Sequence, residues 1–296
     1  MFDDLLMDIF QNIQNLHNNY PLFLYVVIMF LGATIGSFLN VVIYRTPIMI
    51  EFEYADMVKA NADNVHSNID EAFEKGKGMT LSLPRSRCSC CGKTIPWYHN
   101  IPILSYFILK GKCYSCKKSF SSRYVVIEIL HTVAWLSLFY IFGLTSTFII
   151  TSLLFSLLLV LTMIDFDTKL LPNDFVFLVT VLGLLYQASN VESLGLHTAI
   201  YESLILFFIS YAFISVYSKL RGKLMMGFGD IKLIGALTLY IGMFNAIYAI
   251  LIACLSGILY YMLLILMKKV DNDKTFAFGP FLCFGFYGVF IWTLLS

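Results

Sequence analysis

Residues 146–164 read STFIITSLLFSLLLVLTMI, a stretch without any charged side chain, and Asp165 follows it directly. A run of this length predicts a helix that crosses a bilayer, since the hydrocarbon core requires about 20 apolar residues. A helix is expected because no water is present in the core to satisfy unpaired backbone groups. An ionisable residue at the end of such a span marks a candidate functional site. This stretch therefore indicates both the fold class and the first site residue.

Similar apolar runs recur along the chain. Apolar residues make up 59% of the 296 residues and charged residues 13%, about half the charged share of a soluble domain. We expect an all-α polytopic membrane protein with about eight transmembrane helices. The two short runs, Phe175–Ser189 and Leu233–Met243, leave that number open by one or two. The other expected spans are Pro21–Tyr44, Tyr124–Phe142, Ser146–Ile164, Ala199–Tyr217, Asn245–Met267 and Phe276–Leu295.

The positive charges predict the orientation of these spans. All 20 Lys and Arg residues fall in four connections: twelve in 45–123, then Lys169, then 219–232, then 268–274. Eight spans place these alternate connections on one side, and the excess of Lys and Arg in cytoplasmic loops identifies that side as the cytoplasm. We therefore expect these connections to lie in the cytoplasm and both termini to lie outside. Within the cytoplasmic segment between the first two spans, 51–78 is charged and is expected to be a loop or a surface helix.

Four cysteines in that segment predict a metal site. Cys88 and Cys91 form one C-x-x-C pair, and Cys113 and Cys116 form a second. This spacing is typical of a structural four-thiolate zinc site, and a reducing cytoplasm makes disulfides the weaker interpretation. Cys90 is an extra thiol at the wrong spacing for a ligand. Four free cysteines are the alternative without a metal.

A second acidic residue matches Asp165 in depth. Asp230 follows Gly227 and Gly229 at the cytoplasmic start of the sixth span, so the two aspartates could face each other. The glycines would let a helix or a substrate backbone approach closely, and we take Gly227, Gly229 and Lys232 as supporting residues.

Two carboxylates in close contact cannot both ionise. The ionised one can take a proton from water while the protonated one hydrogen-bonds a scissile carbonyl, which is peptide hydrolysis without a metal or covalent intermediate. The plainer alternative is that the aspartates only end helices at the interface. That interpretation is kept for Asp167 and Asp174. Glu128 and Glu202 also fall within spans, where we expect Glu128 to pair with a Lys or Arg and Glu202 to reach the outer surface.

These motifs, in this order, resemble the type IV prepilin peptidase family. The resemblance runs through GSFLNVVIYR at 36–45, PRSRC at 84–88, NIPILS at 100–105, SRYVVIE at 122–128, Ile164-Asp165 with LPN at 171–173, GFGD at 227–230, and FGPF at 278–281. Two features depart from the family's pattern: Ser89-Cys90 stands where it usually has a proline and a variable residue, and 51–78 has no clear motif. The GFGD pattern alone is shared with the presenilin and signal-peptide-peptidase group, from which the cysteines and the first motif distinguish this chain.

The resemblance implies a bifunctional enzyme. It would cut the short basic leader from prepilin or pseudopilin precursors at the cytoplasmic face and then N-methylate the new first residue with S-adenosylmethionine. Residues 1–123 would form the methyltransferase part and 124–296 the peptidase part, with Asp165 and Asp230 catalytic. No residue is assigned to the methyl donor, because the chain has no glycine-rich dinucleotide fingerprint. The expected partners are the precursors and the lipid bilayer, without nucleic acid.

Two rival functions belong to other classes. A transporter or proton channel would use the aspartates in an ion path, but transport sites lie near the membrane midplane rather than at one face. A non-catalytic assembly protein of a pilus or secretion system would use the zinc segment for docking. Loss of cleavage in Asp165→Asn separates a peptidase from both.

Overall fold

The computed structural model describes residues 20–61, 67–88, 90–189, 195–222, 226–267 and 276–296. Of the residues on which the topology prediction rests, Lys223, Lys268, Lys269 and Lys274 lie outside these ranges. The described residues form helices, with two isolated antiparallel bridges beside the cysteines. The helices are α2 (Pro21–Asn61), α3 (Ser67–Gly76), α4 (Leu104–Ile108), α5 (Arg123–Phe142), α6 (Ser146–Thr168), α7 (Asn173–Ser189), α8 (Leu196–Arg221), α9 (Phe228–Leu266) and α10 (Gly279–Leu295).

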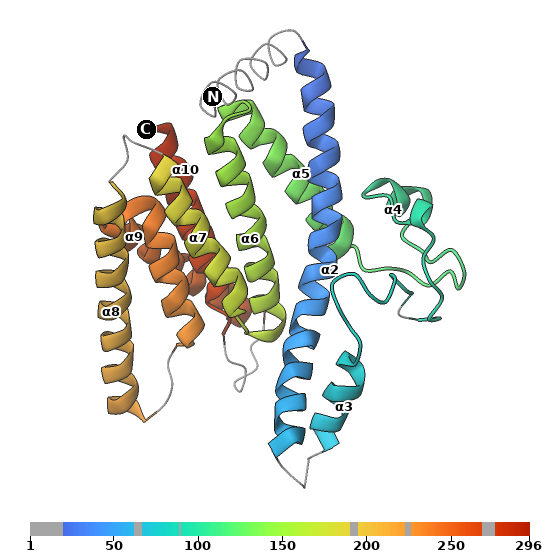
Figure 1. Ribbon diagram of the computed structural model, residues 1–296, viewed down its shortest axis with the longest axis horizontal. Coiled ribbons are helices and arrows are strands. Elements are labelled where there is room, and N and C mark those ends of the chain that lie inside the picture. Colours follow the sequence, from blue (N-terminus) through green and yellow to red (C-terminus); the bar gives the residue numbers. More distant parts are fainter. Residues whose placement is uncertain (1–19, 62–66, 89, 190–194, 223–225, 268–275) are drawn as a thin grey trace, which may run out of the picture. The chain divides into compact units, whose positions relative to one another are not determined.

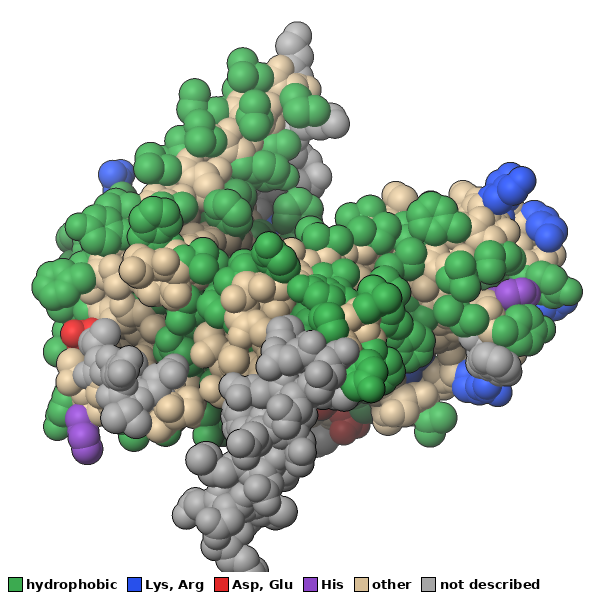
Figure 2. All heavy atoms as spheres, turned by 90° about the horizontal axis from the view of Figure 1, so that it is seen from above, with side chains coloured by type: hydrophobic (Ala, Val, Ile, Leu, Met, Phe, Trp, Pro, Cys, Tyr) green, Lys and Arg blue, Asp and Glu red, His purple; other side chains and the backbone are tan. Residues whose placement is uncertain are grey.

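The expected all-α membrane fold is confirmed, because each predicted apolar run lies in a helix apart from at most three residues at one end (Figure 1). Among the described residues, five helices are long and apolar enough to cross a membrane, and α7 and α10 are shorter apolar helices. Hydrophobic side chains cover much of the surface in Figure 2. A lipid environment accounts for this exposure, since soluble proteins rarely expose such large apolar areas. The chain divides into two compact units, 1–152 and 153–296, with the boundary inside α6.

Helix α9 is two helices rather than one. Gly242 interrupts it with φ 75° and ψ 169°, a conformation that a residue with a Cβ rarely adopts. Both ends of α9 lie at the same end of α6, because the charge of Asp165 acts on Asp230 and the ring of Tyr260 lies 6.5 Å from that of Phe166. The chain therefore folds back at Gly242, as the two separate runs 233–243 and 245–267 predicted.

The acid at position 202 behaves differently from its prediction. Glu202 was predicted to extend to the outer surface, but its carboxylate has a partner within the protein. Its Oε2 accepts a 2.8 Å hydrogen bond from the Met243 N–H, at the start of the second half of α9. The first N–H groups of a helix have no partner within the helix, so this carboxylate satisfies one of them where the chain reverses.

In the first unit, α2 and α5 pack closely because α2 presents glycines to α5. A Cβ added at Gly32 or Gly36 would lie 3.2 Å from the Cα of Thr132 or of Glu128. Two polar contacts join the same helices: Asn40 donates to the Tyr124 carbonyl at 3.0 Å, and His131 Nδ1 lies 2.8 Å from the Gly32 carbonyl oxygen. These contacts give buried polar groups a partner inside the pair.

Helix α2 continues well beyond its predicted end at Tyr44. Residues 45–61 stay helical, and α3 lies against this extension (Figure 1). The rings of Phe52 and Phe73 stack with centroids 5.1 Å apart, and Gly76 lies directly against Phe52. The segment 51–78, expected to be a loop or a surface helix, therefore contributes both sides of a helical hairpin. The segment is charged and poor in large apolar residues, so its helices gave no signal of a membrane span in the sequence.

Arg45 connects α2 to the chain that leads into the cysteines. Its buried guanidinium donates to the carbonyl groups of Thr80, Leu81, Leu83 and Pro84 at 2.6 to 3.3 Å. The planar fork of donors on Arg can satisfy several acceptors at once. This single side chain thereby fixes residues 80–84 against the membrane helix.

In the second unit, α10 packs on the second half of α9 at van der Waals distance. A Cβ added at Gly285 would lie 2.5 Å from the carbonyl oxygen of Ala249, which is backbone and cannot move aside. Gly288 lies one turn further along α10, and a Cβ added there would have no described neighbour within 4 Å. The two glycines of one helix thus differ only in what lies opposite.

We expect Gly285→Ala to lower the midpoint of thermal unfolding in detergent by roughly 2 to 6 °C, because overpacking costs about 1–3 kcal/mol. Gly288→Ala is the matched control. It should leave the midpoint unchanged or raise it slightly, since alanine favours helix over glycine by up to about 1 kcal/mol. Equal midpoints for the two variants would contradict the close packing of α9 and α10.

Candidate functional site

Asp165 lies one turn before the end of α6 and is buried, with an exposed fraction of 4%. Its Oδ2 accepts a 3.0 Å hydrogen bond from the N–H of Gly279, the first residue of α10. That N–H has no acceptor within its own helix, as for all first-turn N–H groups. The start of α10 and the end of α6 are therefore joined through the carboxylate.

Asp230 lies in the first turn of α9 and is also buried. Its N–H donates to the Gly227 carbonyl, and a Cβ on Gly227 would lie 3.4 Å from Asp230 Oδ2. Gly229 lies against a different neighbour. A Cβ there would come within 2.8 Å of the Leu171 side chain. The two glycines therefore leave room beside the carboxylate and for the connection between α6 and α7.

The structure brings these two aspartates to the same end of the second unit. The charge of Asp165 acts on Asp230, and both act on the buried thiol of Cys283 in α10. Asp230 Oδ1 is buried and accepts no hydrogen bond from any residue in the described ranges. A buried acceptor without a partner is costly unless water or a ligand completes it. One carboxylate oxygen is thus left without a partner from the described residues, as a site that binds a water molecule or a substrate group would require.

Three residues next to Asp165 and Asp230 were not among the site residues predicted from the sequence. Gly279 was marked only by the FGPF motif and Leu171 only by the LPN motif, and Cys283 lies outside every motif. Leu171 touches the positions of both Gly229 and Gly279, whereas the thiol of Cys283 lies near both carboxylates. No sequence signal connects residues so far apart, since their proximity depends on how α6, α9 and α10 pack.

Lys232 supports the site at a distance from the carboxylates. Its Nζ donates to Asn173 Oδ1 at 2.8 Å and lies 4.7 Å from the centroid of the Phe228 ring. It therefore connects the start of α9 to the start of α7. Asp167 and Asp174 are both exposed, in agreement with the plainer interpretation given to them.

The four predicted cysteines form one cluster. The sulfur atoms of Cys88, Cys91, Cys113 and Cys116 all lie within 4.8 Å of one another, and those of Cys88 and Cys116 are 3.9 Å apart. Four thiolates around one zinc ion have bonds of about 2.3 Å, which puts neighbouring sulfur atoms a little under 4 Å apart. Cys90 is exposed and outside the cluster, as its spacing predicted. The donor set therefore fits a tetrahedral metal ion.

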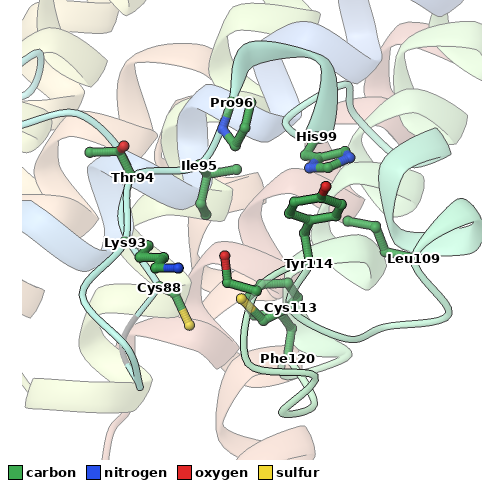
Figure 3. Close-up of a pocket in the computed structure, with 11 residues that line it drawn as sticks. Cys88, Lys93, Thr94, Ile95, Pro96, His99, Leu109, Cys113, Tyr114 and Phe120 are labelled. Atoms are coloured by element: carbon green, nitrogen blue, oxygen red, sulfur yellow. The ribbon is translucent and has the colours of Figure 1, made fainter.

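The two cysteine pairs share one backbone design. The N–H of the first cysteine donates to the carbonyl five residues later, from Cys88 to Lys93 and from Cys113 to Lys118. In each pair the residue after the second cysteine, Gly92 or Lys117, has a positive φ and donates back to the first cysteine. Such a turn points both thiols of a pair to the same side. Figure 3 shows the sulfur atoms of Cys88 and Cys113 turned toward each other.

The environment of Cys88 favours its ionised form. The backbone N–H groups of Cys91 and then Cys90 act on its sulfur and lower the pKa of the thiol to about 6. A metal binds the thiolate rather than the thiol. The chain itself thus prepares one ligand for a metal at neutral pH.

Comparison with known proteins gives consistent matches over most of the chain. Residues 30–142 match the family described as the bacterial peptidase A24 N-terminal domain, and 152–262 match the type IV leader peptidase family. A prepilin leader peptidase/N-methyltransferase of Legionella pneumophila is 32% identical over 90% of both chains. One of Neisseria gonorrhoeae is 33% identical over 84% of both chains. A type 4 prepilin-like proteins leader peptide-processing enzyme of Escherichia coli is 31% identical over 95% of this chain and 96% of its own. No solved structure matches.

We expect the purified chain to hold about one metal ion, because the cluster offers one complete tetrahedron. Cys88→Ser and Cys113→Ser each remove a buried sulfur and should lose the metal, whereas Cys90→Ser should keep it. Elemental mass spectrometry of the purified variants measures the metal content and identifies the ion. Wild-type protein without metal, or equal loss in Cys90→Ser, would contradict the assignment of the four ligands.

Proposed function

The chain belongs to the type IV leader peptidase family, and we propose that it removes the leader of type IV prepilin-like precursors with Asp165 and Asp230 as its catalytic pair. One observation carries the proposal: two buried carboxylates from different helices meet at one end of the second unit, and one carboxylate oxygen has no partner there. An aspartate that only ended a helix would be expected at the surface, as Asp167 and Asp174 are.

The pair acts on a peptide bond through shared proton chemistry. One carboxylate takes a proton from a water molecule, and the water oxygen attacks the carbonyl carbon. The other carboxyl donates a hydrogen bond to the carbonyl oxygen, and the bond to nitrogen breaks as the nitrogen receives a proton. Two carboxyl groups at short distance favour the singly protonated state that this requires. The Gly279 N–H holds the Asp165 carboxylate in place throughout.

We infer further that the chain N-methylates the new first residue, the second activity in the relatives' name. S-adenosylmethionine would supply the methyl group. The hollow beside the cysteines offers the rings of His99, Tyr114 and Phe120 but no carboxylate for ribose hydroxyls or a sulfonium charge. These lining residues do not fit the donor, so we give the hollow no role in binding it. The assignment of methylation to 1–123 and of peptide hydrolysis to 124–296 is part of this proposal.

The metal in the cysteine cluster is proposed to be structural zinc. A structural site has four protein ligands and no open position, which matches the closed set of four sulfur atoms. The cluster joins two turns that are more than twenty residues apart in the chain. Zinc there would stabilise residues 86–120, which contain few helical hydrogen bonds of their own.

We place the cysteines and the aspartates on the cytoplasmic side of the bacterial inner membrane. The support is the one-sided distribution of Lys and Arg in the sequence. Prepilin-like precursors and the surrounding lipid are the expected partners on that side. The Lys and Arg residues cluster in connections to membrane helices, which gives no reason to expect a nucleic-acid ligand.

Gly279→Ala should impair leader cleavage although it leaves both aspartates in the chain. The new Cβ would lie 2.8 Å from Asp165 Oδ2, so the carboxylate must move. A displacement near 1 Å in a catalytic group can cost about a hundredfold in rate. Cleavage of a prepilin by reconstituted enzyme measures the effect. Gly257→Ala is the control, since its Cβ would find only ordinary contacts at 3.6 Å and beyond. A Gly279→Ala enzyme as fast as this control would show that the contact does not position Asp165.

Asp165→Asn and Asp230→Asn should each abolish leader cleavage, because an amide can neither take the proton from water nor replace the shared one. The controls are Asp167→Asn, two residues after Asp165 in α6, and Asp174→Asn, in the first turn of α7. Both positions are exposed, and both variants should retain most of the wild-type rate. The assay is prepilin cleavage at equal enzyme amounts. Robust cleavage by Asp230→Asn, or loss in Asp167→Asn equal to that in Asp165→Asn, would mean that other carboxylates carry the reaction.

A further inference from the structure

The segment 79–123, which we call the cysteine segment, carries positive charge only. It contains eight basic residues and no Asp or Glu: Arg85, Arg87, Lys93, Lys110, Lys112, Lys117, Lys118 and Arg123. A zinc ion with four thiolates adds two negative charges, which leaves the segment strongly positive. Ordinary protein surfaces intersperse both signs. A surface of one sign attracts an anionic partner, and juxtamembrane clusters of this kind are typical of contact with anionic lipids.

The short helix α4 within this segment exposes large apolar side chains. Leu104, Phe107 and Ile108 are exposed on its single turn, and none of its five residues is buried. Lys110 and Lys112 follow directly. Figure 2 shows hydrophobic side chains close to Lys and Arg side chains on this part of the chain. Apolar residues gathered next to positive charge fit a membrane surface, where the former enter the acyl region and the latter meet headgroups.

The depth of α4 follows from a hydrogen bond to α5. The Ile103 N–H, directly before α4, donates to Glu128 Oε2 at 2.7 Å. Glu128 was expected to pair with a basic side chain, but its carboxylate holds this backbone group. It lies five residues after the start of α5, about 7 Å along the helix axis. All 20 residues of α5 are needed to cross the hydrocarbon core of about 30 Å, so α4 begins near the level at which α5 enters the membrane.

A second contact gives the same level on α2. Asn40 of α2 donates to the carbonyl of Tyr124, the second residue of α5. The part of α2 from Pro21 to Asn40 therefore spans the same thickness as α5, and the remainder of α2 projects beyond it. In Figure 1, α4 lies level with the middle of α2 and not with the projecting end that bears α3.

The backbone before α4 is held in an unfavourable conformation. Ile103 has φ 61° and ψ −54° in a three-residue turn in which the Leu104 N–H donates to the Pro102 carbonyl. A β-branched residue in this region is strained. The buried Glu128 carboxylate stabilises the turn by accepting the Ile103 N–H. The turn at Ile103 and its hydrogen bond to Glu128 therefore fix the position of α4, and with it the position of the exposed apolar side chains of α4.

We propose that α4 is an interfacial helix that docks on the lipid leaflet in which α5 begins. Leu104, Phe107 and Ile108 enter the acyl region, and Lys110 and Lys112 bind the headgroups of anionic phospholipids. The docking holds the cysteine segment against the membrane surface. It depends on α5 crossing the membrane but not on the chemistry of the aspartates. A protein partner for the same face is the competing occupant.

The test uses the full chain with the photoreactive residue p-benzoylphenylalanine in place of Phe107. The protein is reconstituted in vesicles of equal parts phosphatidylglycerol and phosphatidylcholine in both leaflets, so that orientation does not affect the outcome. After illumination, intact-mass spectrometry should find phospholipid adducts. The same residue in place of Tyr54 is the control, because Tyr54 is 61% exposed against 63% for Phe107 but lies on the projecting part of α2. It should give none.

Headgroup selectivity tests the charged half of the proposal. Phosphatidylglycerol adducts at position 107 should exceed phosphatidylcholine adducts, and Lys110→Gln with Lys112→Gln should reduce that excess by roughly fivefold per lysine. Lys75→Gln with Lys77→Gln, on and after α3, should leave it unchanged.

Several results would overturn the proposal: protein adducts instead of lipid adducts at 107, equal lipid adducts at 54, or a headgroup ratio unaffected by the loss of Lys110 and Lys112. If the variant at 107 proves unstable, the photoreactive residue in place of Ile108 applies the same criteria.

Discussion

The hydrogen bond from the Gly279 N–H to the Asp165 carboxylate is the contact on which the second unit depends. A carboxylate at the end of an apolar helix is costly in a membrane unless the protein surrounds it with partners. Here the partner is a backbone group that the start of α10 cannot satisfy itself. The bond requires glycine at 279 and brings α10 to the end of α6, where Leu171 and the glycines before Asp230 complete the surroundings.

The first unit follows the same rule with different groups. Asn40, Arg45 and Glu128 are buried polar side chains of membrane helices, and each is satisfied by backbone groups from elsewhere in the unit. Arg45 holds the chain before the first cysteine pair, and Glu128 holds the chain before the second. The geometry of the metal cluster thus depends on polar residues within α2 and α5 as well as on the cysteines. This coupling explains physically why a small segment with little regular structure can keep four sulfur atoms in place.

Much of this architecture could be predicted from the sequence, because apolar runs in a bilayer must be helical and a C-x-x-C pair has few geometric options. The predicted break between 233–243 and 245–267 exists, but it lies at Gly242, two residues before its predicted position. The extension of α2 to Asn61 was missed, because residues 51–78 are charged and poor in large apolar residues and so do not resemble a membrane span. The roles of Glu128 and Glu202 were also missed. Both carboxylates accept hydrogen bonds from backbone N–H groups that are far away in the chain. Every residue except proline has such a group, so the sequence does not show which one will be the donor.

The central claim is that Asp165 and Asp230 work as one unit, and the rate of leader cleavage in the double variant tests it most directly. If the two share one proton, either Asn substitution already removes the function of both, and effects within such a unit are strongly non-additive. The account predicts that Asp165→Asn with Asp230→Asn cleaves prepilin no more slowly than the slower single variant. Losses that multiply in the double variant, each residue contributing its own independent factor, would contradict a shared catalytic role.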